Sequence, residues 1–150
     1  MSRHIDPARL EPASYPFRLV IETQFTDMDV AAHLNNIAIA RFYESARVRS
    51  NIAMFGRDFF RSGAAYLMVL AEANIRYLAE GNFPDPVQVG CGISRIGNSS
   101  FKMLQGLFQS GACIGLCDCV MVLTAGGKPT PIPTDVRAAM QDILMPHTHH

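Results

Sequence analysis

Apolar and polar residues alternate with a period of two along most of this chain of 150 residues. Between residues 17 and 25, Phe17, Leu19, Ile21 and Phe25 fall on one face, and this pattern predicts a half-buried strand. Further strand-like runs cover residues 66–79, 87–96, 100–109 and 112–123, and short turns rich in Gly, Asn and Pro separate them. In the run at 66–79, one face is predicted to hold Leu67, Val69, Ala71, Ala73, Ile75 and Tyr77.

One segment between the first two strand-like runs lacks this alternation. Residues 37–55 contain neither Gly nor Pro, and Gly56 follows them, which is typical of the end of a helix. Asn35 or Asn36 can cap the start of this helix. Because apolar side chains cover more than half of its circumference, we expect other structure to wrap most of it.

The order of these elements predicts the fold class. One strand and one long helix are followed by four strands, and a short helix over residues 135–144, capped by Thr134, is expected near the end. Helices and strands do not alternate, which disfavours a doubly wound parallel sheet. We therefore predict one α+β domain over residues 1–150, with a mostly antiparallel sheet of about five strands folded around a single helix. Residues 1–15 form an N-terminal arm, and residues 146–150 form a C-terminal tail.

Composition narrows the range of functions and partners. Lys plus Arg and Asp plus Glu each number 13, and without a basic stripe we expect no nucleic-acid partner. No apolar run reaches the roughly 20 residues of a spanning helix, and residues 1–16 lack the apolar core of a secretory signal. We therefore expect a cytoplasmic protein with no membrane partner.

The cysteines do not indicate a metal site. Cys91, Cys113, Cys117 and Cys119 form no C-x-x-C pair, and no second cluster of ligands accompanies them. We expect them to be small buried residues in a reducing compartment. The sequence thus predicts neither a metal nor a cofactor.

Polar residues that can carry chemistry gather in one loop directly before the long helix. This segment contains Asp27, Asp29, His33, Asn35 and Asn36. A carboxylate there can act as a general base on water or as a nucleophile, and the unpaired N–H groups at the helix start favour negative charge. A purely structural interpretation also fits, because Asp favours turns and Asn caps helices.

This loop carries a resemblance to a known family. Residues 27–36, DMDVAAHLNN, resemble the opening signature of the acyl-CoA thioesterases related to 4-hydroxybenzoyl-CoA thioesterase, although relatives often have Gly where Ala32 stands. Residues 41–47 resemble the helix that follows the signature, and residues 97–101 resemble a later hairpin turn. The resemblance covers residues 17–133 and implies a hotdog fold, in which an antiparallel sheet wraps around one central helix.

The resemblance also implies an activity and roles for individual residues. It implies hydrolysis of an acyl-CoA thioester to the free acid and CoA, with no metal or cofactor. Asp29 corresponds to the reactive acid, either general base or nucleophile, and the Asn36 amide polarises the thioester carbonyl. His33 orients Asp29, binds water or donates a hydrogen bond to the thioester, while Asp27 is structural. The implied substrate-binding residues are Asn35, Met68, Arg95, Ser99 and Ser100.

Other functions and another base are also considered. A hotdog dehydratase or hydratase places four residues between its Asp and His, whereas three lie between Asp29 and His33. A non-catalytic acyl-CoA binder would be expected to lose the acid, and Asp29 is intact. Some hotdog thioesterases use a glutamate on the helix, but we expect Glu44 to pair with Arg41 or Arg47 one turn away.

Assembly follows from the implied fold. A lone hotdog sheet has an open edge that a second subunit covers by pairing strands. We therefore expect a homodimer or a homotetramer. The strand at residues 66–79 is the predicted pairing edge, which would place the active site at the subunit boundary.

Overall fold

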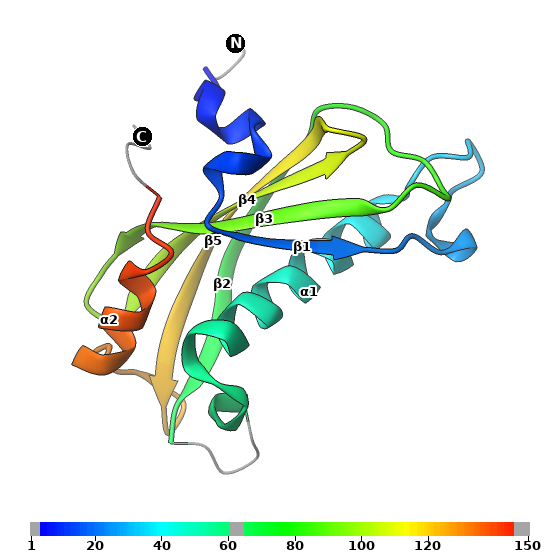
Figure 1. The fold of residues 1–150 in the computed structure, drawn as a ribbon. Coiled ribbons are helices and arrows are strands. Elements are labelled where there is room, and N and C mark those ends of the chain that lie inside the picture. Colours follow the sequence, from blue (N-terminus) through cyan, green and yellow to red (C-terminus); the bar gives the residue numbers. More distant parts are fainter. Residues whose placement is uncertain (1–3, 61–64, 146–150) are drawn as a thin grey trace.

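The computed structural model describes residues 4–60 and 65–145 and shows an antiparallel sheet that curls around one long helix (Figure 1). The strand order is β1-β3-β4-β5-β2, and β6 pairs with β5. This is the predicted α+β arrangement with a two-residue strand added. The tail predicted at residues 146–150 lies outside the described residues. The strands are β1 (Phe17–Ile21), β2 (Leu67–Tyr77), β3 (Val87–Ile96), β4 (Ser100–Gln109), β5 (Ala112–Ala125) and β6 (Lys128–Pro129), and the α-helices are α1 (Asn36–Phe55) and α2 (Thr134–Gln141).

Helix α1 fills the concave side of the sheet, and its start and end agree with the prediction to within one residue. The Asn35 side chain accepts a hydrogen bond from the Ala38 amide at 2.8 Å, and Gly56 ends the helix at a φ of 83°. Phe42 and Tyr43 are almost fully buried in the core between α1 and the sheet. The helix is therefore fixed along its length, and its start is held directly after the polar loop.

Strand β2 differs from the prediction because it contains a bulge between Leu70 and Glu72. Before the bulge, Met68 pairs with Leu123, and after it, Ala73 pairs with Cys119. Both of these partners are buried against α1. A bulge adds one residue, so alternate side chains change faces across it. The single face predicted for Leu67, Val69, Ala71, Ala73, Ile75 and Tyr77 is therefore wrong, because the residues before the bulge face outward and those after it face α1.

Two predictions at the ends of elements are also corrected. Strand β1 ends at Ile21, and Phe25 lies in the 3-10 helix η3 (Phe25–Asp27) with its side chain 73% exposed. Reciprocal hydrogen bonds between Gln24 and Asp27 turn the chain there, so Phe25 cannot join the strand. Thr134 is the first residue of α2 and not its cap, since Pro133 occupies the cap position without a side-chain hydrogen bond.

The N-terminal arm packs on the outer face of the sheet, opposite α1. It forms two 3-10 helices, η1 (Pro7–Leu10) and η2 (Pro12–Ser14). The guanidinium of the buried Arg9 lies 2.8 Å from the Asp118 carboxylate and donates a hydrogen bond to the Tyr15 hydroxyl at 3.0 Å. Burial raises the pKa of Tyr15 to about 12, against the opposing effect of Arg9. The arm predicted from its mixed composition is thus tightly anchored to the sheet.

The cysteines are free thiols, and three of them are core residues. Cys91, Cys117 and Cys119 are buried on the inner face of the sheet, while Cys113 is half-buried. Burial raises the pKa of Cys91 to about 12. The prediction of small buried residues is therefore confirmed for these three cysteines.

Candidate active site

The loop before α1 is closed by its own backbone. The Asp29 amide donates to the His33 carbonyl at 2.8 Å, and Met28 and Leu34 form an antiparallel bridge. Ala32 lies at a φ of 62°, in the left-handed region that glycine adopts most readily. Its backbone conformation gives a physical reason for the glycine that relatives often have at this position.

Asp29 both stabilises this loop and keeps one oxygen free. Its Oδ1 atom accepts hydrogen bonds from the Ala31 amide at 2.9 Å and from the His33 amide at 3.2 Å. The side chain is exposed, and Oδ2 has no hydrogen-bond partner among the described residues. The loop contacts of Asp29 therefore use one oxygen of the carboxylate and leave the other available.

Asp27 has a structural environment, as expected. Its side chain is only 2% exposed, accepts a hydrogen bond from the Gln24 amide at 2.8 Å and lies 2.6 Å from the Arg41 guanidinium. Both carboxylate oxygens are thus occupied. Asp27 fixes the chain between β1 and α1 and leaves no oxygen for substrate.

The expected pairing of Glu44 is wrong. Arg41 contacts Asp27, and the buried Arg47 donates to the Gln105 side chain at 3.0 Å, so neither arginine turns toward Glu44. Glu44 is exposed and has no ion pair within the described part of the chain.

The start of α1 offers two unpaired amides. The Asn35 side chain occupies the Ala38 amide, and the Asn35 amide donates to the Asp27 carbonyl at 2.8 Å. Across residues 4–60 and 65–145, no acceptor is found for the amides of Asn36 and Ile37. These amides lie at the positive end of the helix dipole, where a developing oxyanion would be stabilised. Asn35 itself acts as a cap, which is the structural interpretation of this residue.

His33 contacts a residue that sequence reasoning missed. Its Nε2 atom lies 2.9 Å from Glu80 Oε2, in the segment that follows β2. The Leu34 amide donates to the Gly81 carbonyl at 2.8 Å and holds the two loops together. No motif marks Glu80, because its contact with His33 joins two loops that are distant in sequence.

The other predicted substrate-binding residues lie at the opposite end of the sheet. Ser100 and Met68 pair with neighbouring positions near one end of β5. Tyr77, three residues before Glu80, pairs with Gly115 near the other end of that strand. The remaining members of this group, Arg95 and Ser99, are next to Ser100 in the β3–β4 hairpin. Within one chain, the structure does not bring this group together with Asp29 and His33.

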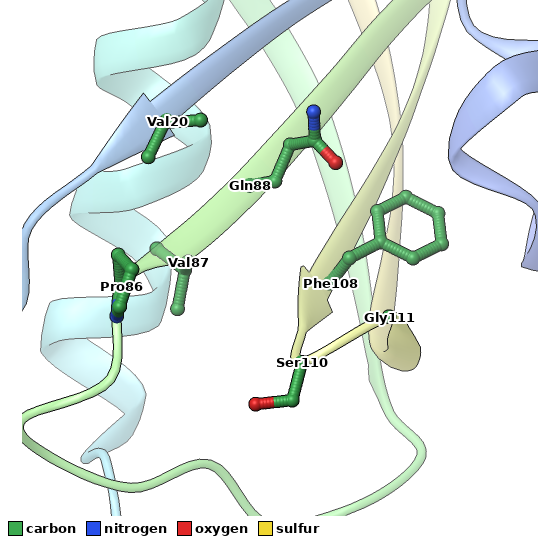
Figure 2. A pocket seen from close by; sticks show the side chains of 7 residues that line it. All are labelled: Val20, Pro86, Val87, Gln88, Phe108, Ser110 and Gly111. Carbon is green, nitrogen blue, oxygen red and sulfur yellow. The ribbon is translucent and has the colours of Figure 1, made fainter.

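A separate pocket of about 200 Å³ lies on the outer face of the sheet, and it contains none of the predicted site residues (Figure 2). Val20, Gln88 and Phe108 pair in a row across β1, β3 and β4 to form its floor. The lining is mostly apolar and includes no ionisable side chain. We therefore assign it no catalytic role.

Residues 23–140 match the model of the Thioesterase-like superfamily, and the chain belongs to this family. Its curled sheet around one helix is the hotdog fold, so the resemblance stated from the sequence is confirmed.

Solved structures share this fold. A Pseudomonas aeruginosa protein superposes with a TM-score of 0.83 at 23% identity, over 93% of this chain and 99% of that one. A Thermus thermophilus thioesterase complexed with coenzyme A and Zn gives a TM-score of 0.77 at 27% identity, over 87% and 95%. A Synechocystis 1,4-dihydroxy-2-naphthoyl-CoA thioesterase gives 0.75 at 17% identity, over 85% and 96%, a likeness of fold alone. No curated protein sequence matches the chain.

Two further properties concern the described residues only. Among them, no group of three or more His, Cys, Asp or Glu side chains could hold a metal ion. In the same part of the chain, no helix has the length and apolar character needed to cross a membrane.

Proposed function

We propose that this protein hydrolyses acyl-CoA thioesters and that Asp29 supplies the reactive carboxylate. The free Oδ2 atom of Asp29, in the loop that leads directly into the two unpaired amides of α1, carries this proposal. A general base or nucleophile and an oxyanion site are the two elements that thioester hydrolysis needs. Family membership and the coenzyme A bound by the Thermus thermophilus relative support the substrate class.

In this mechanism, each residue has a defined part. The thioester carbonyl oxygen binds at the Asn36 and Ile37 amides, which stabilise the charge that grows as the carbonyl is attacked. Asp29 Oδ2 either removes a proton from the attacking water or attacks the carbonyl carbon itself. His33, on the same loop, supplies a hydrogen bond to water or to the thioester.

The complete site is proposed to form between two chains. Strand β2 is an edge strand of 11 residues with exposed apolar side chains, including Leu67 at 60% and Tyr77 at 56%. Antiparallel pairing of β2 with β2 of a second copy places the Leu67 end of one chain beside the Tyr77 end of the other. The partner's β3–β4 hairpin, with Arg95, would then come to the Asp29 end, where its cation can bind a CoA phosphate.

The experiment that tests this function compares the wild type with Asp29→Asn on acyl-CoAs of different length, branching and aromatic character. We expect the variant to lose about a hundredfold or more in kcat while it still binds a non-hydrolysable CoA thioether. Thioester absorbance is the preferred signal, because a thiol reagent would also report the four cysteines of the protein.

Glu44→Gln is the matched control, because Glu44 is an exposed carboxylate on α1, the helix that follows the Asp29 loop. This control should retain wild-type kcat. Equal rates for wild type and Asp29→Asn would contradict the role of Asp29. If the wild type binds every acyl-CoA and hydrolyses none, the protein is a binder with the fold of an enzyme.

A further inference from the structure

The contact between His33 and Glu80 is placed so that it can orient the His33 side chain. The two side chains meet at 2.9 Å through His33 Nε2 and Glu80 Oε2. His33 is also bound to the reactive loop at its backbone, since its amide donates to Asp29 Oδ1 and its carbonyl accepts from the Asp29 amide. Glu80 therefore acts on a histidine whose main chain is already fixed relative to Asp29.

The segment that carries Glu80 is held from both sides. The amides of Leu78 and Ala79 both donate to the Ile114 carbonyl, at 3.0 and 3.2 Å, and the Gly81 carbonyl accepts from the Leu34 amide at 2.8 Å. A Cβ atom at Gly81 would lie 2.7 Å from Leu34 Cδ1, so glycine allows this close approach. The position of the Glu80 backbone is thus set by main-chain contacts and not by its own side chain.

The contact contributes little to folding. The Glu80 side chain is 71% exposed and that of His33 is 34% exposed, and even charged pairs in such exposed settings have small effects on stability. A variant of Glu80 should therefore fold normally. This exposure makes the contact testable independently of stability.

From these observations, we propose that Glu80 is a positioning residue that holds the His33 imidazole with Nε2 protonated and Nδ1 unprotonated. A neutral imidazole has one N–H donor and one acceptor nitrogen, and the partner of one nitrogen fixes the role of the other. A carboxylate only accepts, so Nε2 donates to Glu80. Nδ1 is then the acceptor for a hydrogen bond from water or substrate. This role rests on the proposed thioesterase function.

The test uses Glu80→Ala, which removes the acceptor, and Glu80→Gln, whose side-chain oxygen can still accept from Nε2. The ¹⁵N chemical shifts of the imidazoles, measured at pH 8 where an ordinary imidazole is neutral, report the tautomer, and His33→Gln identifies the signal of His33. We expect the Nε2-protonated form alone in the wild type and Glu80→Gln, and averaging of both tautomers in Glu80→Ala.

Kinetics provide the second readout. We expect kcat to fall about tenfold in Glu80→Ala with little change in KM, and Glu80→Gln to retain most of the rate, as for other residues that orient a catalytic group. Glu22→Ala is the matched control, because Glu22 is an exposed carboxylate directly after β1 with no ion pair among the described residues. This control should leave both readouts at wild-type values.

The proposal is overturned if Glu80→Ala leaves the His33 tautomer unchanged, whatever happens to the rate. It is also overturned if Glu80→Ala and Glu80→Gln lose the same activity, because charge and not orientation would then be responsible. Failure of the thioesterase function is a different result: the wild type would hydrolyse no acyl-CoA, while the tautomer measurement would still report on Glu80 and His33.

Discussion

Asp27 and Asp29 are separated by a single residue, yet their environments are opposite. Asp27 is buried and both of its oxygens are occupied by the Gln24 amide and Arg41, whereas Asp29 is exposed and keeps Oδ2 free. A carboxylate that is 2% exposed and has a partner on each oxygen has little access to water. The difference between the structural acid and the proposed reactive acid thus depends on their surroundings in the loop, and not on the chemistry of either residue.

A double-mutant cycle tests the structural role of Asp27. Arg41→Met should destabilise the protein by about 1–3 kcal/mol, because the buried carboxylate loses its cation. The cost is below that of a fully buried pair because Arg41 is half exposed. The same change should cost much less in an Asp27→Asn background, which removes the buried charge. Urea unfolding gives both free energies, and equal costs in the two backgrounds would contradict this role.

At the scale of elements, the sequence predicts those helices and strands whose bounds are determined by short-range patterns. Helix α1 was predicted to within one residue because its caps and its apolar face are local features, and β3 and β4 were predicted at their observed bounds for the same reason. The bulge in β2 was not predicted, because the alternation continues through it and only pairing with β5 shows the extra residue.

The residues of the candidate site likewise separate into those that a local sequence pattern identifies and those that only the structure shows. Asp29, His33 and the helix start are contained in one short signature, so the sequence identifies them together. Glu80 was missed because its contact with His33 joins two loops that are distant in sequence. Arg95 and Ser99 were proposed from resemblance alone, and within one chain they lie at the other end of the sheet from Asp29.

The packing of the N-terminal arm leads to a prediction about an element. A Cβ atom at Gly90 would lie 2.5 Å from the Tyr15 ring, which covers this part of β3. Gly90→Ala should therefore destabilise the protein by about 1–3 kcal/mol through overpacking. In a Tyr15→Ala background, the added methyl group has space, so its cost should largely disappear. Thermal or urea unfolding of the four proteins measures this, and an undiminished cost would show that the strain arises elsewhere.

At the scale of the whole molecule, the isolated chain has its reactive loop at one end of the sheet and its candidate CoA-binding hairpin at the other. The strand order leaves β2 at an edge along 11 residues, while the shorter β1 forms the opposite edge. Two-fold pairing through β2 would resolve both features together, because it covers the apolar edge and brings each hairpin to the partner's reactive loop. In this proposed arrangement, catalysis as well as stability would require the dimer.

Complementation between two impaired variants tests this arrangement. Asp29→Asn removes the proposed reactive carboxylate, and Arg95→Ala should lower kcat/KM about tenfold by removing the cation proposed to bind a CoA phosphate. If each site combines Asp29 of one chain with Arg95 of the other, a mixed dimer has one intact site and one doubly defective site. Random mixing gives half mixed dimers, so co-refolded variants should recover about a quarter of wild-type activity.

Val69→Lys is the informative control, because Val69 is an exposed apolar residue of β2, 40% accessible in the isolated chain. A lysine there should oppose pairing through β2, shift the protein toward monomer in sedimentation experiments and abolish the recovery. The same substitution at Val20, which is 62% exposed on the other edge strand, should leave both assembly and recovery unchanged. Mixing that never exceeds the sum of the two parent activities would mean that each site is built within a single chain, and the Arg95 hairpin would then have no part in binding CoA.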